Sequence, residues 1–180
     1  MKNRNVIVDL FYNVAVGSKM IRGILAPIVA VFFFAVVCLM IFCSFQLDKI
    51  IGVPAFLPAR ISYLTAIPLI IAGMLMIGWP MFYFFLSKGT PVPLAPPPKL
   101  IFDGPYKYSR NPMVTGIFIL LFGFGFLWDS ISLVMIFTPL FTILNAIELK
   151  MVEEPELEKR LGNEYVKYKE RTPMFFPWIR

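Results

Sequence analysis

The chain has 180 residues, of which 58% are hydrophobic and 16% are charged. An ordinary soluble domain carries about 25% charged residues and buries about 70% of its unfolded surface at this size. A soluble core cannot hide so much apolar surface, so the composition predicts that lipid covers much of it. Histidine is absent, which excludes Ser-His-Asp hydrolases, HExxH zinc enzymes and proteins with His-ligated haem.

The charge pattern and the cysteines argue against nucleic-acid binding, a disulfide and a metal site. The net charge is +6, but no basic run interleaved with aromatic residues lies on a polar domain, so the pattern does not indicate nucleic-acid binding. Cys38 and Cys43 lie five residues apart in one apolar run and form no Cys-x-x-Cys pair. We therefore expect neither a disulfide nor a metal site.

Four apolar segments predict transmembrane helices. Residues 24–45 and 61–86 contain no charge and exceed the roughly 20 residues needed to cross a bilayer. Residues 113–128 and 130–147 are shorter and are separated only by Asp129, which predicts a helical hairpin. Gly116, Gly123 and Gly125 are expected to allow close packing within this hairpin.

The basic residues predict the orientation of these helices. With both termini on one side, 15 of the 17 Lys and Arg residues lie there, and only Lys49 and Arg60 lie opposite. The positive-inside rule then places both termini and the proline-rich loop 87–112 in the cytosol. We expect a bacterial inner membrane, because no eukaryotic retention signal closes the chain.

Outside these spans, residues 6–16 could form an interfacial helix. The tail predicts a helix over 153–161, a stop at Gly162 and an amphipathic helix over 163–171, with the apolar residues 174–178 returning to the membrane. The fold class is thus an all-α integral membrane protein with about four transmembrane helices, a C-terminal hairpin and a cytosolic C-terminal amphipathic helix. We divide it into an N-terminal part, 1–86, and a catalytic, cofactor-binding part, 87–180.

Two polar motifs flank the hairpin. Arg110, Asn111 and Pro112 immediately precede its first helix, where proline suits the first turn and backbone N–H groups can hold an anion. Glu153 and Glu154 follow its second helix closely, and an acidic pair at the bilayer surface is costly unless it meets a cation. The two motifs therefore predict a binding site at one end of the hairpin.

These residues resemble a known family. The string Gly104-Pro105-Tyr106-x-x-x-Arg110-Asn111-Pro112-x-x-x-Gly116, followed by Glu153-Glu154-x-x-Leu157-x-x-x-Leu161-Gly162-x-x-Tyr165-x-x-Tyr168, looks like the isoprenylcysteine carboxyl methyltransferase family. It is also similar to the wider set of membrane methyltransferases that includes phospholipid N-methyltransferases. The resemblance covers the C-terminal half of the chain.

The resemblance implies an enzyme that uses S-adenosylmethionine to methylate a lipophilic acceptor entering from the bilayer. It places Arg110 and Glu154 at the reacting pocket, and it implies that cofactor contacts come from Lys99, Leu100, Ile101, Tyr106, Asn111, Pro112, Met113, Val114 and Glu153. Chemically, Glu153 can hold the cofactor's ammonium group and Arg110 its carboxylate. Tyr106 could pack on the adenine or ribose, and Glu154 could take a proton from an amine acceptor.

The sequence departs from the family at three places. Asn111 stands where histidine is commoner, Val114 where an aromatic residue is frequent, and the arginine usually found before the acidic pair is missing. The acceptor, an isoprenylcysteine-type carboxylate or a phospholipid amine, therefore stays open. Two further alternatives are an NADPH-dependent sterol reductase, which shares a similar Arg-His/Asn-Pro signature, and an inactive membrane scaffold.

Overall fold

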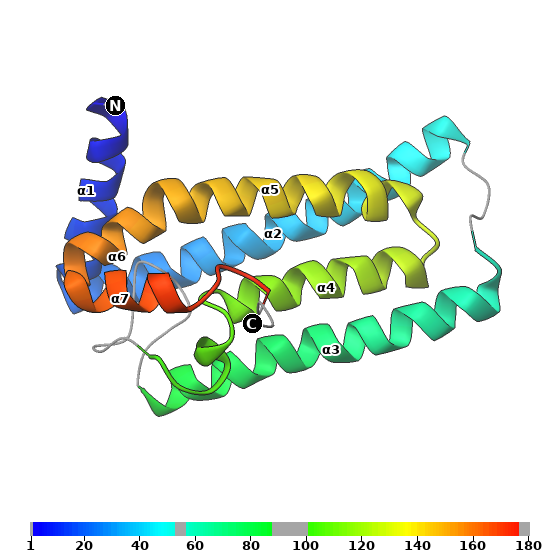
Figure 1. Cartoon of the computed structure of the whole chain (residues 1–180). Helices are drawn as coiled ribbons and strands as arrows, with labels where there is room; N and C mark the ends of the chain where they lie inside the picture. Colours follow the sequence, from blue (N-terminus) through cyan, green and yellow to red (C-terminus); the bar gives the residue numbers. More distant parts are fainter. Residues whose placement is uncertain (1, 53–56, 88–100, 177–180) are drawn as a thin grey trace.

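The computed structural model describes residues 2–52, 57–87 and 101–176, and all regular structure within these ranges is helical (Figure 1). The prediction of an all-α protein is thus confirmed. In chain order the elements are α1 (Lys2–Val16), α2 (Lys19–Ile51), α3 (Ala59–Leu86), the 3-10 turn η1 (Gly104–Lys107), α4 (Pro112–Leu127), the π-helical turn η2 (Leu133–Phe137), α5 (Thr138–Glu148), the π-helical turn η3 (Leu149–Glu153), α6 (Glu154–Leu161) and α7 (Asn163–Arg171).

Three helices are long and apolar enough to cross a membrane: α2 with 33 residues, α3 with 28, and a continuous 29-residue helix over Leu133–Leu161. The helix predicted to end at residue 147 thus runs on through α5, η3 and α6. Helix α4 has only 16 residues, fewer than the roughly 17 to 25 of most spanning helices. The chain is an integral membrane protein, and the count of four crossings stays a prediction.

The most extensive contact between two helices joins α3 and α4, which run side by side in Figure 1. A Cβ atom at Gly73 of α3 would lie 2.8 Å from the backbone N of Leu120 and 2.9 Å from the backbone O of Gly116. Gly116 and Gly123 therefore serve the contact with α3, because a Cβ at Gly123 would meet Ile70. The prediction that they pack within the hairpin was wrong for these two glycines.

The predicted hairpin between α4 and α5 is present. Asp129 turns the chain with a φ of 54°, and a Cβ at Gly125 would lie 2.5 Å from Val134 across the hairpin, as predicted for this glycine. The carboxylate of Asp48, near the end of α2, accepts hydrogen bonds from the Ser130 hydroxyl and from the backbone N–H of Ser132 at 3.0 Å. This contact ties α2 to the tip of the hairpin.

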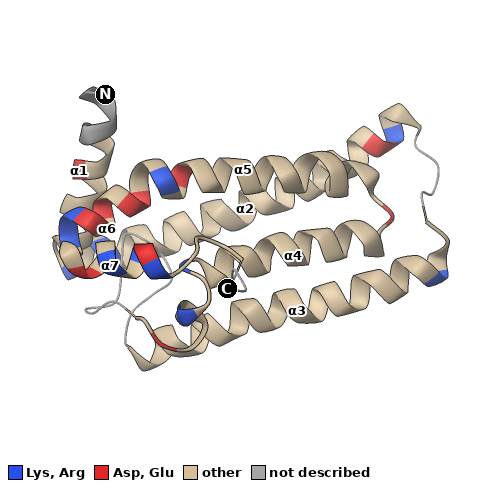
Figure 2. Cartoon of the chain, viewed as in Figure 1, with Lys and Arg blue, Asp and Glu red and all other residues tan. Residues whose placement is uncertain are grey.

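The core lies between α4 and α5, and the outer faces of the bundle are apolar. Phe118, Leu121, Leu133 and Phe141 form the buried cluster, and α2 adds partly buried side chains such as Phe33. Large apolar residues such as those at positions 32, 34 and 85 are exposed, which suits contact with lipid. Charged residues gather at one end of the bundle, and a few lie at the other (Figure 2).

The α3–α4 contact can be tested with two single substitutions. Gly73→Ala places a methyl group against backbone atoms of α4 and should lower the free energy of unfolding by about 1–3 kcal/mol. Gly78→Ala is the matched control, because a Cβ there meets nothing within 4 Å, and it should be neutral or stabilising by about 0.5–1 kcal/mol. Thermal unfolding in detergent measures both, and equal melting temperatures would contradict the assigned contact.

Candidate active site at the start of α4

The approach to α4 is held by packing against α3. Gly104 has a φ of 62°, and a Cβ at this position would lie 2.3 Å from the ring of Tyr83, so the first position of η1 requires glycine. The chain then passes through η1, and Pro112 occupies the first turn of α4 as predicted. This path places Arg110 two residues before the start of α4.

The C-terminal segment returns to this approach. The backbone N–H of Arg110 donates to the carbonyl of Pro173 at 2.9 Å, and that of Asn111 donates to the carbonyl of Met174 at 3.1 Å. The Phe175 ring packs edge-on against Phe118, with ring centroids 5.3 Å apart. The tail therefore returns to the bundle and forms one wall of the site; residues 177–180 lie outside the described ranges.

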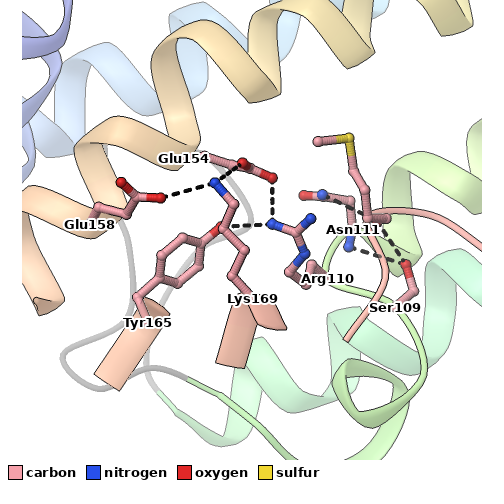
Figure 3. Close-up of polar contacts among 8 residues, drawn as sticks. Ser109, Arg110, Asn111, Glu154, Glu158, Tyr165 and Lys169 are labelled. Atoms are coloured by element: carbon pink, nitrogen blue, oxygen red, sulfur yellow. Dashed lines mark hydrogen bonds and ion pairs between the residues drawn. The ribbon is translucent and has the colours of Figure 1, made fainter. Parts of the chain in front are cut away.

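A buried carboxylate joins three segments of the chain (Figure 3). The Glu154 side chain is 4% exposed and forms ion pairs with Arg110 and with Lys169, whose ammonium lies 2.6 Å from Oε2. Lys169 also lies 2.9 Å from Glu158. The acidic pair was predicted to need a cation, and the structure supplies two to Glu154. The hydrogen bond to Glu154 also raises the pKa of Lys169, which favours its charged form.

The acidic pair follows an irregular turn of the helix. The π-helical turn η3 ends at Glu153, two residues before Pro155. Proline has no N–H group for the regular helical hydrogen bond. Such π-helical turns occur often at functional sites. Glu153 and Glu154 lie at the junction between this turn and α6.

Tyrosines line the cluster. Tyr165 is 3% exposed, and its hydroxyl accepts a hydrogen bond from Arg110 Nη1 at 3.5 Å. The Tyr168 hydroxyl donates to the Tyr106 carbonyl at 2.7 Å. Burial raises the pKa of Tyr165 to about 12 and also raises the pKa of Tyr106 and of Tyr168. All three phenols are therefore neutral near pH 7.

The structure brings some of the predicted site residues together and leaves others apart. Arg110 and Glu154 are in direct contact. The Asn111 amide donates to the Met174 carbonyl at 3.3 Å and so holds the tail. Val114 packs against the core cluster. Ile101, Met113 and Tyr106 are half-buried, and Lys99 and Leu100 lie outside the described residues.

Two groups in the site have unused hydrogen-bonding capacity. Within the described residues, the Glu153 side chain makes no hydrogen bond or ion pair, and its electrostatic neighbours are mostly other carboxylates. The Arg110 Nε atom is buried without a hydrogen-bond partner, and Arg110 borders a groove of about 370 Å³ beside Lys169 and Met174. An unpaired carboxylate and an unsatisfied guanidinium donor fit the ammonium and carboxylate groups of S-adenosylmethionine.

Sequence reasoning missed Lys169 and the backbone of residues 173–175. Lys169 lies four residues after Tyr165 on α7 and so shares its face, which is the signal that could have found it. The groups of residues 173–175 that matter are main-chain carbonyls, which no side-chain motif reveals. No cluster of three or more potential metal ligands occurs in the part of the chain that the structure describes.

The chain is a helical membrane bundle with a buried ion-pair cluster at one end, and ionisable groups in such a setting often mark a functional site. A family model described as phospholipid methyltransferase matches residues 61–164. The chain belongs to this family and is an S-adenosylmethionine-dependent membrane methyltransferase. The match contains Arg110, Glu153 and Glu154 and ends before Tyr165. No curated protein matches the chain.

The ion-pair cluster predicts unequal effects at its two acidic residues. Glu154→Ala leaves the nearly buried Arg110 without its carboxylate and should lower the free energy of unfolding by about 3–5 kcal/mol. Glu158→Ala is the control: the Glu158 side chain is 40% exposed and pairs with Lys169, so its loss should cost about 0–1 kcal/mol. Thermal unfolding in detergent compares the two, and a larger loss for Glu158→Ala would refute the cluster.

Proposed function

We propose that the site at the start of α4 binds S-adenosylmethionine and transfers its methyl group to an acceptor carried by a membrane lipid. The contact between Arg110 and Glu154 supports this proposal most directly, because it joins the two motifs on either side of the hairpin. It does so in a chain of a methyltransferase family. When bound, the cofactor supplies a methyl group on a positively charged sulfur.

The roles of the cofactor-binding residues follow from their free groups. Glu153 holds the ammonium group, because it is the carboxylate of the cluster that has no ion-pair partner among the described residues. Arg110 Nε and the N-terminal turn of α4 hold the carboxylate. Tyr106 packs on the adenine or ribose, and Ile101 and residues 111–113 complete the pocket.

The role of Glu154 depends on the acceptor. A carboxylate acceptor carries its own nucleophilic oxygen and needs no proton acceptor, so Glu154 then serves to orient Arg110. An amine acceptor loses a proton, and Glu154 is the carboxylate of the cluster that we propose to take it. In both cases the rate gain comes mainly from alignment of donor and acceptor and from exclusion of water.

The acceptor enters from the bilayer with its apolar tail left among the lipids. The apolar outer faces of the helices support this route. We place the site and both termini at the cytosolic side, because most basic residues gather at this end. An isoprenylcysteine-type carboxylate and a phospholipid amine both fit this arrangement. The description of the family, phospholipid methyltransferase, suits the phospholipid amine equally well.

Ligand-induced stabilisation tests the cofactor. S-adenosylhomocysteine at about 100 times its Kd should stabilise the full chain in detergent by about 2.7 kcal/mol, because it binds only the folded state. NADPH should leave the melting temperature unchanged. The reverse preference would favour a reductase, and no response to either would favour an inactive scaffold.

The proposed ammonium site predicts a specific loss of affinity. Glu153→Gln removes the charge but keeps the shape, and should weaken S-adenosylhomocysteine binding about tenfold or more, because hydrogen bonds to charged groups contribute about 1.5–3 kcal/mol. Glu158→Gln, five residues along the same helix, should bind almost as tightly as wild type. Isothermal titration calorimetry measures both, and equal Kd values for the two variants would remove Glu153 from the site.

A further inference from the structure

Helix α1 lies outside both the family match and the proposed cofactor site. The match begins at residue 61, whereas α1 covers Lys2–Val16 and packs against α2, η3 and α6. It runs across the long axis of the bundle, at the end where charged residues gather (Figure 1, Figure 2). Methyl transfer at the start of α4 does not explain why the chain carries this helix.

One face of α1 is held against α6. Val8 and Ala15 on this face are 8% and 5% exposed, and Tyr12 lies between them at helical spacing. The ammonium of Lys159, on α6, lies 4.3 Å from the centroid of the Tyr12 ring and 2.7 Å from the Asp9 carboxylate. These contacts fix α1 against the helix whose first residue belongs to the ion-pair cluster of the candidate site.

A second face of α1 is apolar and uncovered. Val6, Ile7 and Leu10 are 63%, 46% and 60% exposed, and spacings of three and four residues place them side by side on the helix. An exposed patch of neighbouring apolar residues indicates contact with another apolar phase. The N-terminal part of α1 also extends past α5 and α6 in Figure 1, so these helices leave the patch open to its surroundings.

The depth of α1 in the membrane identifies the bilayer as the occupant of this patch. The spanning helix α2 begins at Lys19, three residues after α1 ends, and its uncharged run begins at Ile24. Basic residues just before such a run lie at the level of the headgroups. Arg22 Nη1 donates to the carbonyl of Ala15 at 3.2 Å and so holds the end of α1 at this level. A helix that leaves this level across the bundle axis lies along the membrane surface.

We propose that α1 is an interfacial helix whose Val6, Ile7 and Leu10 patch inserts at the boundary between headgroups and acyl chains, and that α1 braces α6 at that depth. Asp9 and Tyr12 are positioning residues, because they act on α6 through Lys159. The inference goes beyond the proposed function, since it assigns a lipid-binding surface outside the methyl-transfer site. A helix of this kind gains affinity from its buried apolar area.

The first test measures the depth of α1 with nitroxide labels on the full chain in nanodiscs of phosphatidylcholine and phosphatidylglycerol. The labels are attached to Ile7→Cys, Leu10→Cys or Asn13→Cys in a background that replaces the two native cysteines with alanine. The ratio of collisions with oxygen to collisions with a water-soluble nickel chelate should be at least about threefold higher at positions 7 and 10 than at position 13. Asn13 is the control, because it is exposed and polar and lies six residues from Ile7, on another face.

Two outcomes of this measurement would overturn the proposal. Free access of the nickel chelate to all three labels would place α1 in water. Protection of positions 7 and 10 from both reagents would show that protein covers the patch, and a second copy of the chain would then be its occupant.

Amide hydrogen exchange in the same nanodiscs tests the bracing of α6. Leu10→Gln weakens the lipid contact and should speed exchange of residues 154–161 about threefold to tenfold, whereas Asn13→Gln should leave it unchanged. Asp9→Asn/Tyr12→Leu removes the contacts with Lys159 and should also speed this exchange, with the label at position 7 still in lipid. Exchange of α6 at the wild-type rate in both cases would contradict the brace. Neither measurement uses the cofactor, so failure of the proposed function would leave both results intact.

Discussion

The buried carboxylate of Glu154 is the constraint on which the site depends. A carboxylate removed from water is costly unless cations and hydrogen bonds replace its hydration. Its two partners come from segments far apart in the sequence, Arg110 before α4 and Lys169 on α7. Satisfying Glu154 therefore fixes α7 against the start of α4. The return of the tail to residues 109–111 follows from the same placement.

Much of the fold could be predicted because the length of an apolar segment and the residues that begin or end a helix are local properties of the sequence. The turn at Asp129, the stop at Gly162 and the first turn at Pro112 each depend on a few neighbouring residues. The end of the long helix could not be predicted in this way. Polarity rises after residue 147, but the backbone continues as a helix because no glycine interrupts it before position 162 and the π-helical turn η3 accommodates Pro155.

The glycines show where sequence patterns stop being informative. A small residue indicates that another helix approaches closely, but its position does not say which helix. Gly125 faces its neighbour within the hairpin, whereas Gly116 and Gly123 face α3. The pairing depends on how the helices rotate about their axes in the assembled bundle, which is a property of the whole fold.

The same limit applies to the site. Arg110 and Glu154 could be predicted because each stands in a motif beside an apolar helix, where a charge needs an explanation. Lys169 and Lys167 look alike in the sequence, as two lysines on a polar helix, yet they serve different surfaces. Lys169 shares the face of Tyr165 and reaches Glu154, whereas Lys167 lines a separate open groove on the protein surface. Tyr168 borders that groove and bonds to Tyr106, so neighbouring residues of one short helix serve the buried cluster, the open groove and the approach to α4.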